Sequence, residues 1–367
     1  MKNKKYDVFL ITGGTGGHIF PAINFSEYLS SKGISNLLIT DIRGTNYFNK
    51  KNNNFKIIFS SHLNKKNFNF LKGILILMIG LIQFKILFFR YRPKKIITFG
   101  SYTSLTPLIC AMFYKKIFKT NVYFHEQNSV IGSVHKVFLF TADKVFTTFK
   151  DTRGLYSNHK VIHTGFPSSK KIKEFKKNSL SFTKKLNKLN LVVFGGSQGA
   201  SNLSIKIVDL LTNLSLKYQS LIDLTIQVPQ KDLNLLNLKL SESKITFEIS
   251  TFYYDILQRL SKSDLCICRS GSSTINEIIS LKIPSILIPL PTSKKNHQYY
   301  NAKYLSDLNA AILIEEKNLS KDNVLNIIKD ISLNKKLLKS LFQNLNKIKE
   351  LDTNKLMYKE IFNKKNE

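Results

Sequence analysis

The sequence has few cysteines, few acidic residues and no apolar leader. Its three cysteines, two of them in a Cys-Ile-Cys run, match neither a zinc-site spacing nor a disulfide framework, which fits a reducing cytoplasm. The lysine-rich start lacks the apolar segment of a secretory signal before Gly13. Asp-x-Asp, the usual carboxylate clamp for a metal-bound diphosphate, is absent. We therefore expect no metal and no cofactor.

Basic residues outnumber acidic ones by 56 to 24, and the formal net charge is +32. Such an excess is typical of proteins that bind nucleic acid, anionic membranes or anionic substrates, and it also arises from a lysine-rich drift of composition. The lysines are spread along the chain, and no RNA-binding aromatic motif, zinc finger or basic heptad region accompanies them. We expect no nucleic-acid partner.

Short β-rich runs alternate with longer helical stretches along most of the 367 residues, a pattern that predicts βαβ units and a parallel sheet. A second series of the same kind begins at Leu189. The expected strands of the first series are 6–12, 36–40, 56–59, 95–99, 121–125, 145–149 and 161–164. The second series opens with a strand within 189–200 and continues with 224–228, 245–249, 265–268, 285–288 and 311–314. The predicted fold is α/β, with two doubly wound Rossmann-like domains facing a cleft. We expect domains at 1–165 and 166–347, with a C-terminal helix at about 348–367 packing back on the first.

Each predicted domain opens with a strand that runs into glycines, "LITGGTGGHIF" and "LVVFGGSQGA". Such turns let backbone amides at a helix start approach an anion. Neither loop is a complete dinucleotide or P-loop fingerprint, and each could be a tight turn only. Asp41 leaves open a nicotinamide-dependent oxidoreductase, because an acid after the second strand can bind a ribose. His18, at the helix start where protonation is disfavoured, is a candidate general base or simply a hydrogen-bonded turn residue.

Two polar segments of the second domain carry further candidates. In "CRSGSSTINEII", small residues at a helix start suit a diphosphate, and Glu277 suits a ribose, although an ordinary surface glutamate would look the same. In "NHQYYNA", Gln298 and Asn301 share a helix face near His297. Amide side chains suit sugar hydroxyls, and these residues are equally compatible with a solvated surface.

These motifs together resemble the MurG family of GT-B-fold glycosyltransferases. The resemblance rests on "GGTGGHIFPA", "HEQNSVIG", "GGSQGA", "CRSGSSTINE" and "HQYYNA", which occur in the family's order from near the N-terminus past residue 300. It implies an inverting, metal-independent transfer of N-acetylglucosamine from UDP-N-acetylglucosamine to undecaprenyl-diphosphate-linked N-acetylmuramoyl pentapeptide. That reaction converts lipid I to lipid II in peptidoglycan synthesis, at the cytoplasmic side of the inner membrane.

The resemblance also implies roles for individual residues. His18 is the implied catalytic base, with Glu126 as the other catalytic candidate. The implied acceptor-binding residues are Gly14, Thr15, Gly16, Gly17, Tyr102 and Asn128. The implied UDP-N-acetylglucosamine-binding residues are Thr15, Gly16, Gly17, Asn128, Ser197, Gln198, Ser270, Gly271, Ser272, Glu277, Gln298 and Asn301.

Some positions depart from the family pattern. Ser101 stands where the family has a second glycine, and it should restrict the backbone at that turn. Phe166 and Ser169 replace an asparagine and an arginine of the family's linker, which puts one cationic donor contact in doubt. A His-Gln-x-Gly stretch survives only as "IQVP". A degenerate, non-catalytic peripheral membrane protein is the alternative that these losses leave open.

An apolar segment flanked by basic residues runs from Gly73 to Lys95. Its uncharged part, from Gly73 to Gln83, is shorter than the roughly 20 residues needed to span a bilayer. Apolar residues occupy every face of the expected helix, so its outer side must be covered. Either another protein element covers it, or the helix lies in an anionic membrane surface.

Overall fold

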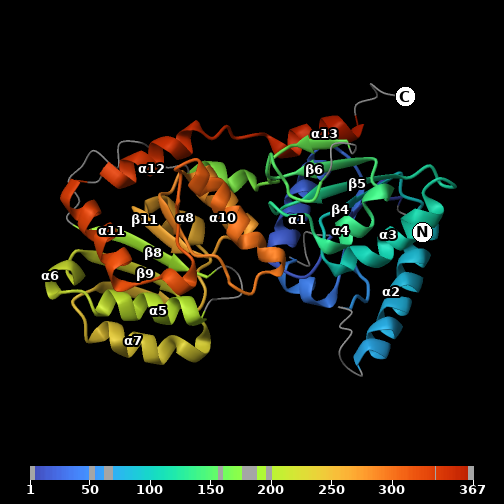
Figure 1. The fold of residues 1–367 in the computed structure, drawn as a ribbon. Helices are drawn as coiled ribbons and strands as arrows, with labels where there is room; N and C mark the ends of the chain where they lie inside the picture. The colour runs from blue at the N-terminus through green and yellow to red at the C-terminus, as the bar shows by residue number, and fades with distance from the viewer. Residues whose placement is uncertain are drawn as a thin grey trace. The chain divides into compact units, whose positions relative to one another are not determined.

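The computed structural model describes residues 5–48, 54–61, 69–155, 160–175, 188–195, 201–334 and 336–362, with only the backbone described at 69–70, 170, 173, 321 and 329–334. The chain divides into two compact units, Met1–Ser168 with Leu351–Glu367, and Ser169–Glu350. Each unit contains one fully parallel sheet with helices on its faces (Figure 1).

The sheet of the first unit has the strand order β3-β2-β1-β4-β5-β6-β7. The strand β1 pairs with β2 on one side and with β4 on the other, so the strand order reverses its direction between β1 and β4. The elements are β1 (Val8–Ile11), α1 (Gly16–Ser31), β2 (Asn36–Thr40), η1 (Ile42–Tyr47), β3 (Phe55–Ile57), α2 (Asn69–Tyr91), β4 (Lys95–Thr98), η2 (Tyr102–Ser104), α3 (Leu105–Tyr114), β5 (Asn121–Glu126), α4 (Ser133–Val137), η3 (Leu139–Thr141), β6 (Lys144–Thr147), β7 (Val161–His163) and α13 (Thr353–Phe362).

The sheet of the second unit has the order β10-β9-β8-β11-β12-β13, with its reversal between β8 and β11. Its elements are η4 (Lys170–Phe175), β8 (Leu189–Phe194), α5 (Ser201–Thr212), α6 (Leu216–Gln219), β9 (Ile222–Gln227), η6 (Gln230–Asp232), α7 (Leu233–Ser241), β10 (Thr246–Ser250), α8 (Ile256–Lys262), β11 (Leu265–Cys268), α9 (Ser272–Leu281), β12 (Ser285–Leu287), η7 (Lys294–Asn296), α10 (His297–Asp307), β13 (Ile312–Leu313), η8 (Glu316–Asn318), α11 (Lys321–Asn334) and α12 (Lys336–Lys347). All the predicted strands are present, most with ends shifted by one or two residues.

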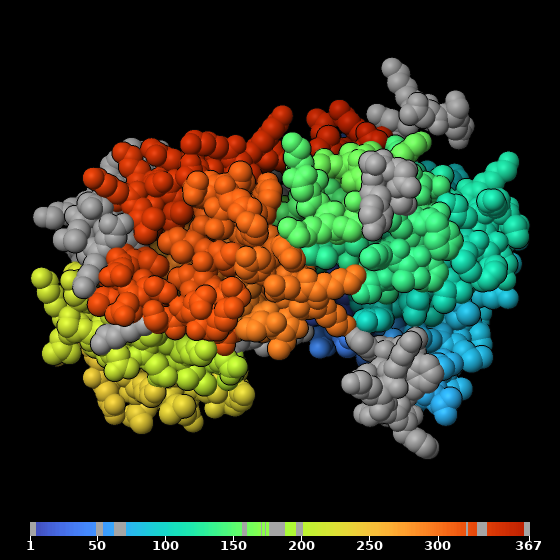
Figure 2. Space-filling model, viewed as in Figure 1, coloured from blue at the N-terminus to red at the C-terminus, as the bar shows by residue number. Residues whose placement is uncertain are grey.

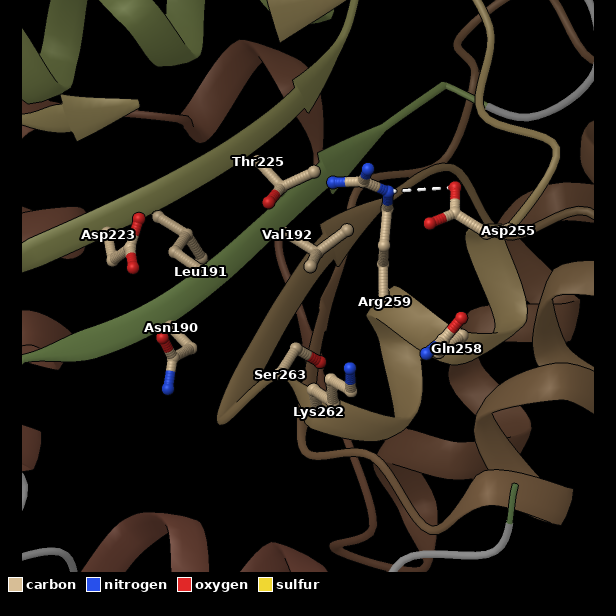
Figure 3. Close-up of a pocket in the computed structure, with 10 residues that line it drawn as sticks. All are labelled: Asn190, Leu191, Val192, Asp223, Thr225, Asp255, Gln258, Arg259, Lys262 and Ser263. Atoms are coloured by element: carbon tan, nitrogen blue, oxygen red, sulfur yellow. Dashed lines mark hydrogen bonds and ion pairs between the residues drawn. The ribbon is translucent and has the colours of Figure 1, made fainter. Parts of the chain in front are cut away.

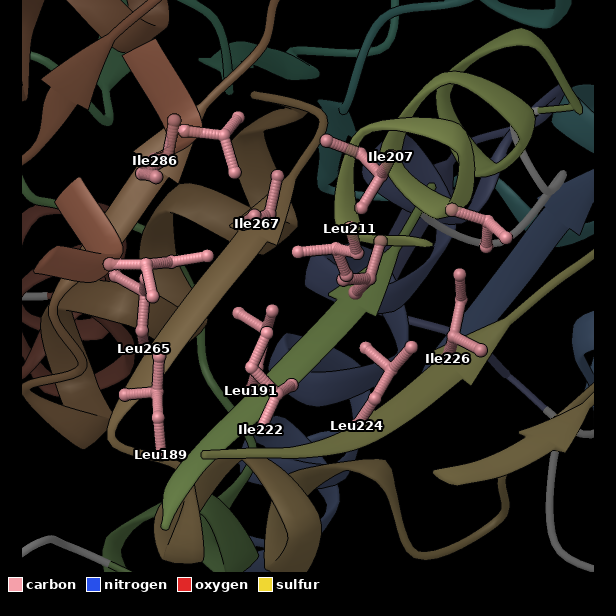
Figure 4. Packing of buried hydrophobic residues seen from close by; sticks show 14 of the residues in the cluster. Leu189, Leu191, Ile207, Leu211, Ile222, Leu224, Ile226, Leu265, Ile267 and Ile286 are labelled. Carbon is pink, nitrogen blue, oxygen red and sulfur yellow. The ribbon is translucent and has the colours of Figure 1, made fainter. Parts of the chain in front are cut away.

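The central strands are apolar because helices cover both faces of each sheet. In the second unit, Leu191 and Leu224 from the sheet pack with Ile207 and Leu211 of α5, as Figure 4 shows. In the first unit, Phe9 of β1 packs edge-on against Phe84 of α2, with ring centroids 6.1 Å apart. These cores fix the sheets, so that the loops after the strands are held at one edge of each sheet.

Helix α13 returns to the first unit after the chain has built the second one. Thr353 donates a hydrogen bond to the Thr164 carbonyl at 2.7 Å, and Lys144 of β6 pairs with Glu360 at 2.8 Å. Tyr358 also contacts Tyr28 of α1, edge to face. The C-terminal helix is therefore an integral part of the first unit.

Helix α2 packs on the sheet through one face only. Phe84 and Phe88 are completely buried, whereas a stripe on the other face is between 38% and 67% exposed. The stripe consists of Leu71, Leu75, Met78, Ile79, Ile82, Ile86 and Phe89. Figure 2 shows atoms of this helix, in light blue, at the surface of the unit. Burial of the whole helix between protein layers, one of the two sequence-based alternatives, is therefore wrong.

Candidate active site

The loop after β1 places the first helix start at the edge of the sheet where the order reverses. Thr15 is the N-cap of α1, and Gly16 and Gly17 form its first turn. Gly14 has a φ of 81°, which glycine adopts without strain. The first amides of a helix lack intrahelical acceptors, so Gly16 and Gly17 provide donors for an anion at this edge.

The buried Asp41 carboxylate organises the same loop from the end of β2. It accepts hydrogen bonds from the Gly14 amide at 3.3 Å and the Gly44 amide at 3.0 Å, and it pairs with Arg43. Burial raises the pKa of Asp41, but these partners, Arg43 foremost, outweigh burial and hold the pKa below its ordinary value. Gly14 thus bonds to a protein carboxylate, and Asp41 is engaged with backbone and Arg43 rather than placed for a nicotinamide ribose.

His18 lies beside the loop that follows β4. A β-carbon on Gly100 would lie 3.7 Å from both His18 Nε2 and His135 Cε1, so the two imidazole rings border the same glycine. Tyr102, another predicted site residue, begins η2 in this loop and is half-buried. The structure therefore brings His18 and Tyr102 to neighbouring loops.

Ser101, the residue that departs from the family's glycine, has φ 70° and ψ 163°. This region of backbone space is essentially restricted to glycine and costs other residues about 1–3 kcal/mol. Ser101 therefore adopts a glycine-type conformation with backbone strain, and its restriction of the turn stays a prediction.

Glu126 ends β5 with its carboxylate buried and engaged by several donors. Its oxygens accept bonds from the amides of Asn128 (3.2 Å) and Gly132 (2.9 Å) and from His135 Nδ1 (3.2 Å). Burial raises the pKa of Glu126, but His135 and the two amides outweigh it, and the net pKa lies below its ordinary value. A carboxylate with a lowered pKa and these bonds is a poor proton acceptor.

In the second unit, the helix start after β11 collects several predicted residues. Gly271 is the N-cap of α9 and Ser272 is its first residue. Ser270 is fully buried and donates to the Gln298 carbonyl at 2.7 Å. Asn301 is also fully buried, and its amide donates to the Ser270 carbonyl at 3.1 Å. The start of α10 is thereby fastened to the loop before α9.

Gln298 and Asn301 are part of this internal network, not solvated surface residues. The Gln298 side-chain oxygen accepts the Leu290 amide at 3.0 Å. Their contact with the N-acetylglucosamine of the donor stays a prediction. His297 is half-buried, and its Nδ1 lies 2.8 Å from the Lys294 carbonyl oxygen.

Glu277 lies on α9, about one and a half turns after its start. Its side chain is half-buried by surface area, yet the surrounding protein raises the pKa of Glu277 to about 7 by desolvating the carboxylate. The Glu277 carboxyl group therefore changes its protonation state near neutral pH.

Sequence reasoning missed Arg269 and His135 as supporting residues. Arg269 is buried, pairs with Glu316 at 2.7 Å and donates to the carbonyls of Ile288 and Pro289. The signal in the sequence was an arginine directly after an apolar strand, inside "CRSGSSTINE". His135 had a weaker signal, a histidine three residues into the segment after Gly132.

For some of the predicted donor-site positions, the structure describes no contact that bears on the prediction. Ser197 and Gln198 lie outside the described residues. Phe166 is buried, and the Ser169 hydroxyl accepts the Lys171 amide at 3.3 Å. Within the described residues, no group of three or more histidine, cysteine or carboxylate side chains could hold a metal ion.

A polar pocket of about 440 Å³ opens between α8 and the first halves of β8 and β9 (Figure 3). Its Arg259 pairs with Asp255 at 2.9 Å and with Glu248 at 2.6 Å. None of the predicted site residues lines it. Because ligands of open α/β sheets bind beyond the carboxyl ends of the strands, this pocket is not the candidate site.

Comparison with known proteins shows family matches in both halves of the chain. Residues 8–147 match the glycosyltransferase family 28 N-terminal domain, and residues 190–356 match the glycosyltransferase family 28 C-terminal domain. A UDP-N-acetylglucosamine–N-acetylmuramyl-(pentapeptide) pyrophosphoryl-undecaprenol N-acetylglucosamine transferase of Wolbachia sp. subsp. Drosophila simulans is 34% identical, over 91% of this chain and 92% of the relative. The protein of that name from Rickettsia prowazekii is 33% identical, over 92% of this chain and 94% of its own.

Solved structures share the fold. The crystal structure of Acinetobacter baumannii MurG superposes with a TM-score of 0.78 at 21% identity, covering 98% of this chain and 99% of that one. The glycotransferase of kitacinnamycin superposes with a TM-score of 0.67 at 11% identity, covering 94% and 95%. The two parallel-sheet units are those of a GT-B fold.

Proposed function

This chain belongs to the MurG family of glycosyltransferases, and from that premise we propose that it transfers N-acetylglucosamine from UDP-N-acetylglucosamine to a lipid-linked N-acetylmuramoyl pentapeptide. The observation that carries the proposal is the pair of helix starts, at α1 and at α9, that follow strands beside the reversal point of each sheet. Open α/β sheets bind ligands at such points, and helix starts bind phosphate groups.

The donor is assigned to the second unit. Amides and hydroxyls at Gly271 and Ser272 would bind the UDP diphosphate without a metal ion. Glu277 would accept hydrogen bonds from the ribose hydroxyls, and Gln298 and Asn301 would face the sugar. The bonds that tie Gln298 and Asn301 to Ser270 support this assignment, because they hold all three residues beside the start of α9.

The acceptor is assigned to the first unit. Thr15, Gly16 and Gly17 at the start of α1 would bind its diphosphate, with Tyr102 and Asn128 beside it. Gly14 would shape the loop instead of binding phosphate, since its amide donates to Asp41. Of the two catalytic candidates, His18 is favoured as base, because the Glu126 carboxylate already accepts three hydrogen bonds.

The proposed reaction is a single displacement. His18 takes the proton from the acceptor 4-hydroxyl as that oxygen bonds to C1 of N-acetylglucosamine, and the bond from C1 to the UDP oxygen breaks with inversion. The α9 helix start stabilises the negative charge that develops on the departing diphosphate. The products are UDP and a β-1,4-linked disaccharide on the lipid carrier.

The exposed stripe of α2 supports a membrane location. Basic residues flank it, and no aspartate or glutamate occurs between Asp41 and Glu126. Lys85 lies over the rings of Phe89 and Tyr114, 5.9 and 5.7 Å from their centroids, so its charge sits at the border of the apolar stripe. We infer that α2 lies in an anionic bilayer surface at the cytoplasmic face, next to the lipid-linked acceptor.

By length and composition alone, residues Leu71–Tyr91 are also sufficient to cross a membrane. The complete burial of Phe84 and Phe88 against the sheet favours the interfacial position over a crossing, because a spanning helix would have to leave its own core.

The test is transfer by purified protein supplied with labelled UDP-N-acetylglucosamine and a short-chain lipid-linked muramoyl pentapeptide, with and without EDTA. The proposal predicts a labelled lipid product in both cases. Release of UDP without lipid product, or no reaction at all, would contradict it.

A further inference from the structure

His135 is a buried histidine that no part of the proposed reaction uses. Its side chain is 1% exposed and stacks on Phe124 of β5, with ring centroids 4.5 Å apart and an interplanar angle of 12°. Both ring nitrogens have partners: Nδ1 lies 3.2 Å from Glu126 Oε2, and Nε2 lies 2.8 Å from Thr98 Oγ1. The ring thus joins the ends of β4 and β5.

The partner carboxylate in turn holds the loop that follows β5. Glu126 Oε1 accepts the Asn128 amide, and Oε2 accepts the Gly132 amide. His135 Nδ1 makes the third hydrogen bond to the Glu126 carboxylate. One buried charge therefore fixes both ends of the segment between Asn128 and Gly132, and Asn128 is a proposed acceptor contact.

We propose that His135 is a positioning residue for the acceptor side, which holds the Glu126 carboxylate and through it the loop that carries Asn128. This proposal rests on the proposed function for its catalytic consequence. The ring also borders Gly100, the glycine that His18 approaches from its own side. The same histidine thereby supports two neighbouring parts of the proposed acceptor site.

The chemistry of the ring explains why a histidine is suited to this position. With Nδ1 protonated, a neutral imidazole donates to the carboxylate and accepts the Thr98 hydroxyl at Nε2, so no buried polar atom of the ring is left over. A phenyl ring, which is one atom larger and has no nitrogens, would keep an aromatic face against Phe124 but remove the donor. The Glu126 carboxylate would then stay buried with one bond fewer, which is costly for a charged group.

The variants separate packing from hydrogen bonding. His135→Phe keeps an aromatic ring, one atom larger, and removes both nitrogens. His135→Asn can place an amide nitrogen where Nδ1 is, next to Glu126, whereas His135→Gln extends its amide toward the Nε2 position, next to Thr98. His163→Phe is the matched control, because His163 belongs to the same unit and is exposed.

The first measurement is deuterium uptake at the amides of Asn128 and Gly132. We expect about tenfold or faster exchange in His135→Phe and His135→Gln, and parental exchange in His135→Asn and His163→Phe, because only the first two lose the donor to Glu126. Should His135→Phe fail to fold, the comparison of the Asn and Gln variants decides. Equal exchange in all variants would overturn the proposal.

The second measurement is steady-state transfer with both substrates varied. We expect kcat/KM for the lipid acceptor to fall about 10- to 100-fold in His135→Phe, with rescue in His135→Asn. KM for UDP-N-acetylglucosamine should stay within about twofold, because the proposed diphosphate, ribose and sugar contacts of the donor, at Gly271, Ser272, Glu277, Gln298 and Asn301, are in the second unit. A matching rise in the donor KM would reveal general damage and count against the proposal. If the parental protein transfers no sugar, the proposed function fails, and the exchange data alone still decide the role of His135.

Discussion

The exposed stripe of α2 allows its contribution to the free energy of membrane binding to be estimated. Leu75, Ile82 and Ile86 are 60%, 57% and 60% exposed, and all three belong to the same stripe. Full burial of such a side chain contributes about 1.5–3 kcal/mol, so burying the exposed part of each in lipid contributes roughly 1 kcal/mol. Replacing all three by serine should therefore weaken vesicle binding by about 3 kcal/mol, or roughly 100-fold in the partition coefficient.

The assay is co-sedimentation with vesicles that contain an anionic phospholipid, at several salt concentrations. A matched control exists on the second unit, where Leu235 and Leu238 of α7 and Leu216 of α6 are 52%, 60% and 64% exposed. Serine at those three positions should leave vesicle binding unchanged, and the circular dichroism of both triple variants should match that of the parent. Equal losses in the two triple variants, or no loss in the α2 variant, would refute an interfacial α2.

The remaining predictions concern the proposed site. Because both Glu277 oxygens accept from the two ribose hydroxyls only when the carboxyl is ionised, and its pKa is about 7, calorimetry should show UDP-N-acetylglucosamine binding about tenfold more weakly at pH 6 than at pH 8. Glu277→Gln should bind weakly with no such pH dependence. His18→Ala should lower kcat for transfer about 10²- to 10⁴-fold while UDP affinity persists, and parental turnover would exclude His18 as the base. Ser101→Gly should raise the free energy of unfolding in urea by about 1 kcal/mol by relieving the strained turn, and a lower value would show that the hydroxyl stabilises the loop.

The site residues differ in how far the sequence predicted them. His18, Ser270 and Gly271 lie where local pattern places them, at helix starts that follow apolar strands. Glu126 was predicted as a catalytic candidate from its motif, but only the structure reveals that its carboxylate is bound to His135 and two amides. Those partners are two to nine residues away in sequence, and no periodicity predicts which of them meet.

The sequence by itself determined the two parallel sheets, because alternating apolar runs and helical stretches bury strands in only this way. It also determined the family, through motifs that carry the glycine turns and polar helix starts. Tertiary structure alone decided which face of α2 is exposed, which amide Asp41 engages and which charged groups are buried. Those properties depend on how the segments pack in three dimensions, because a buried polar group is stable only where the packing supplies its hydrogen-bond partners.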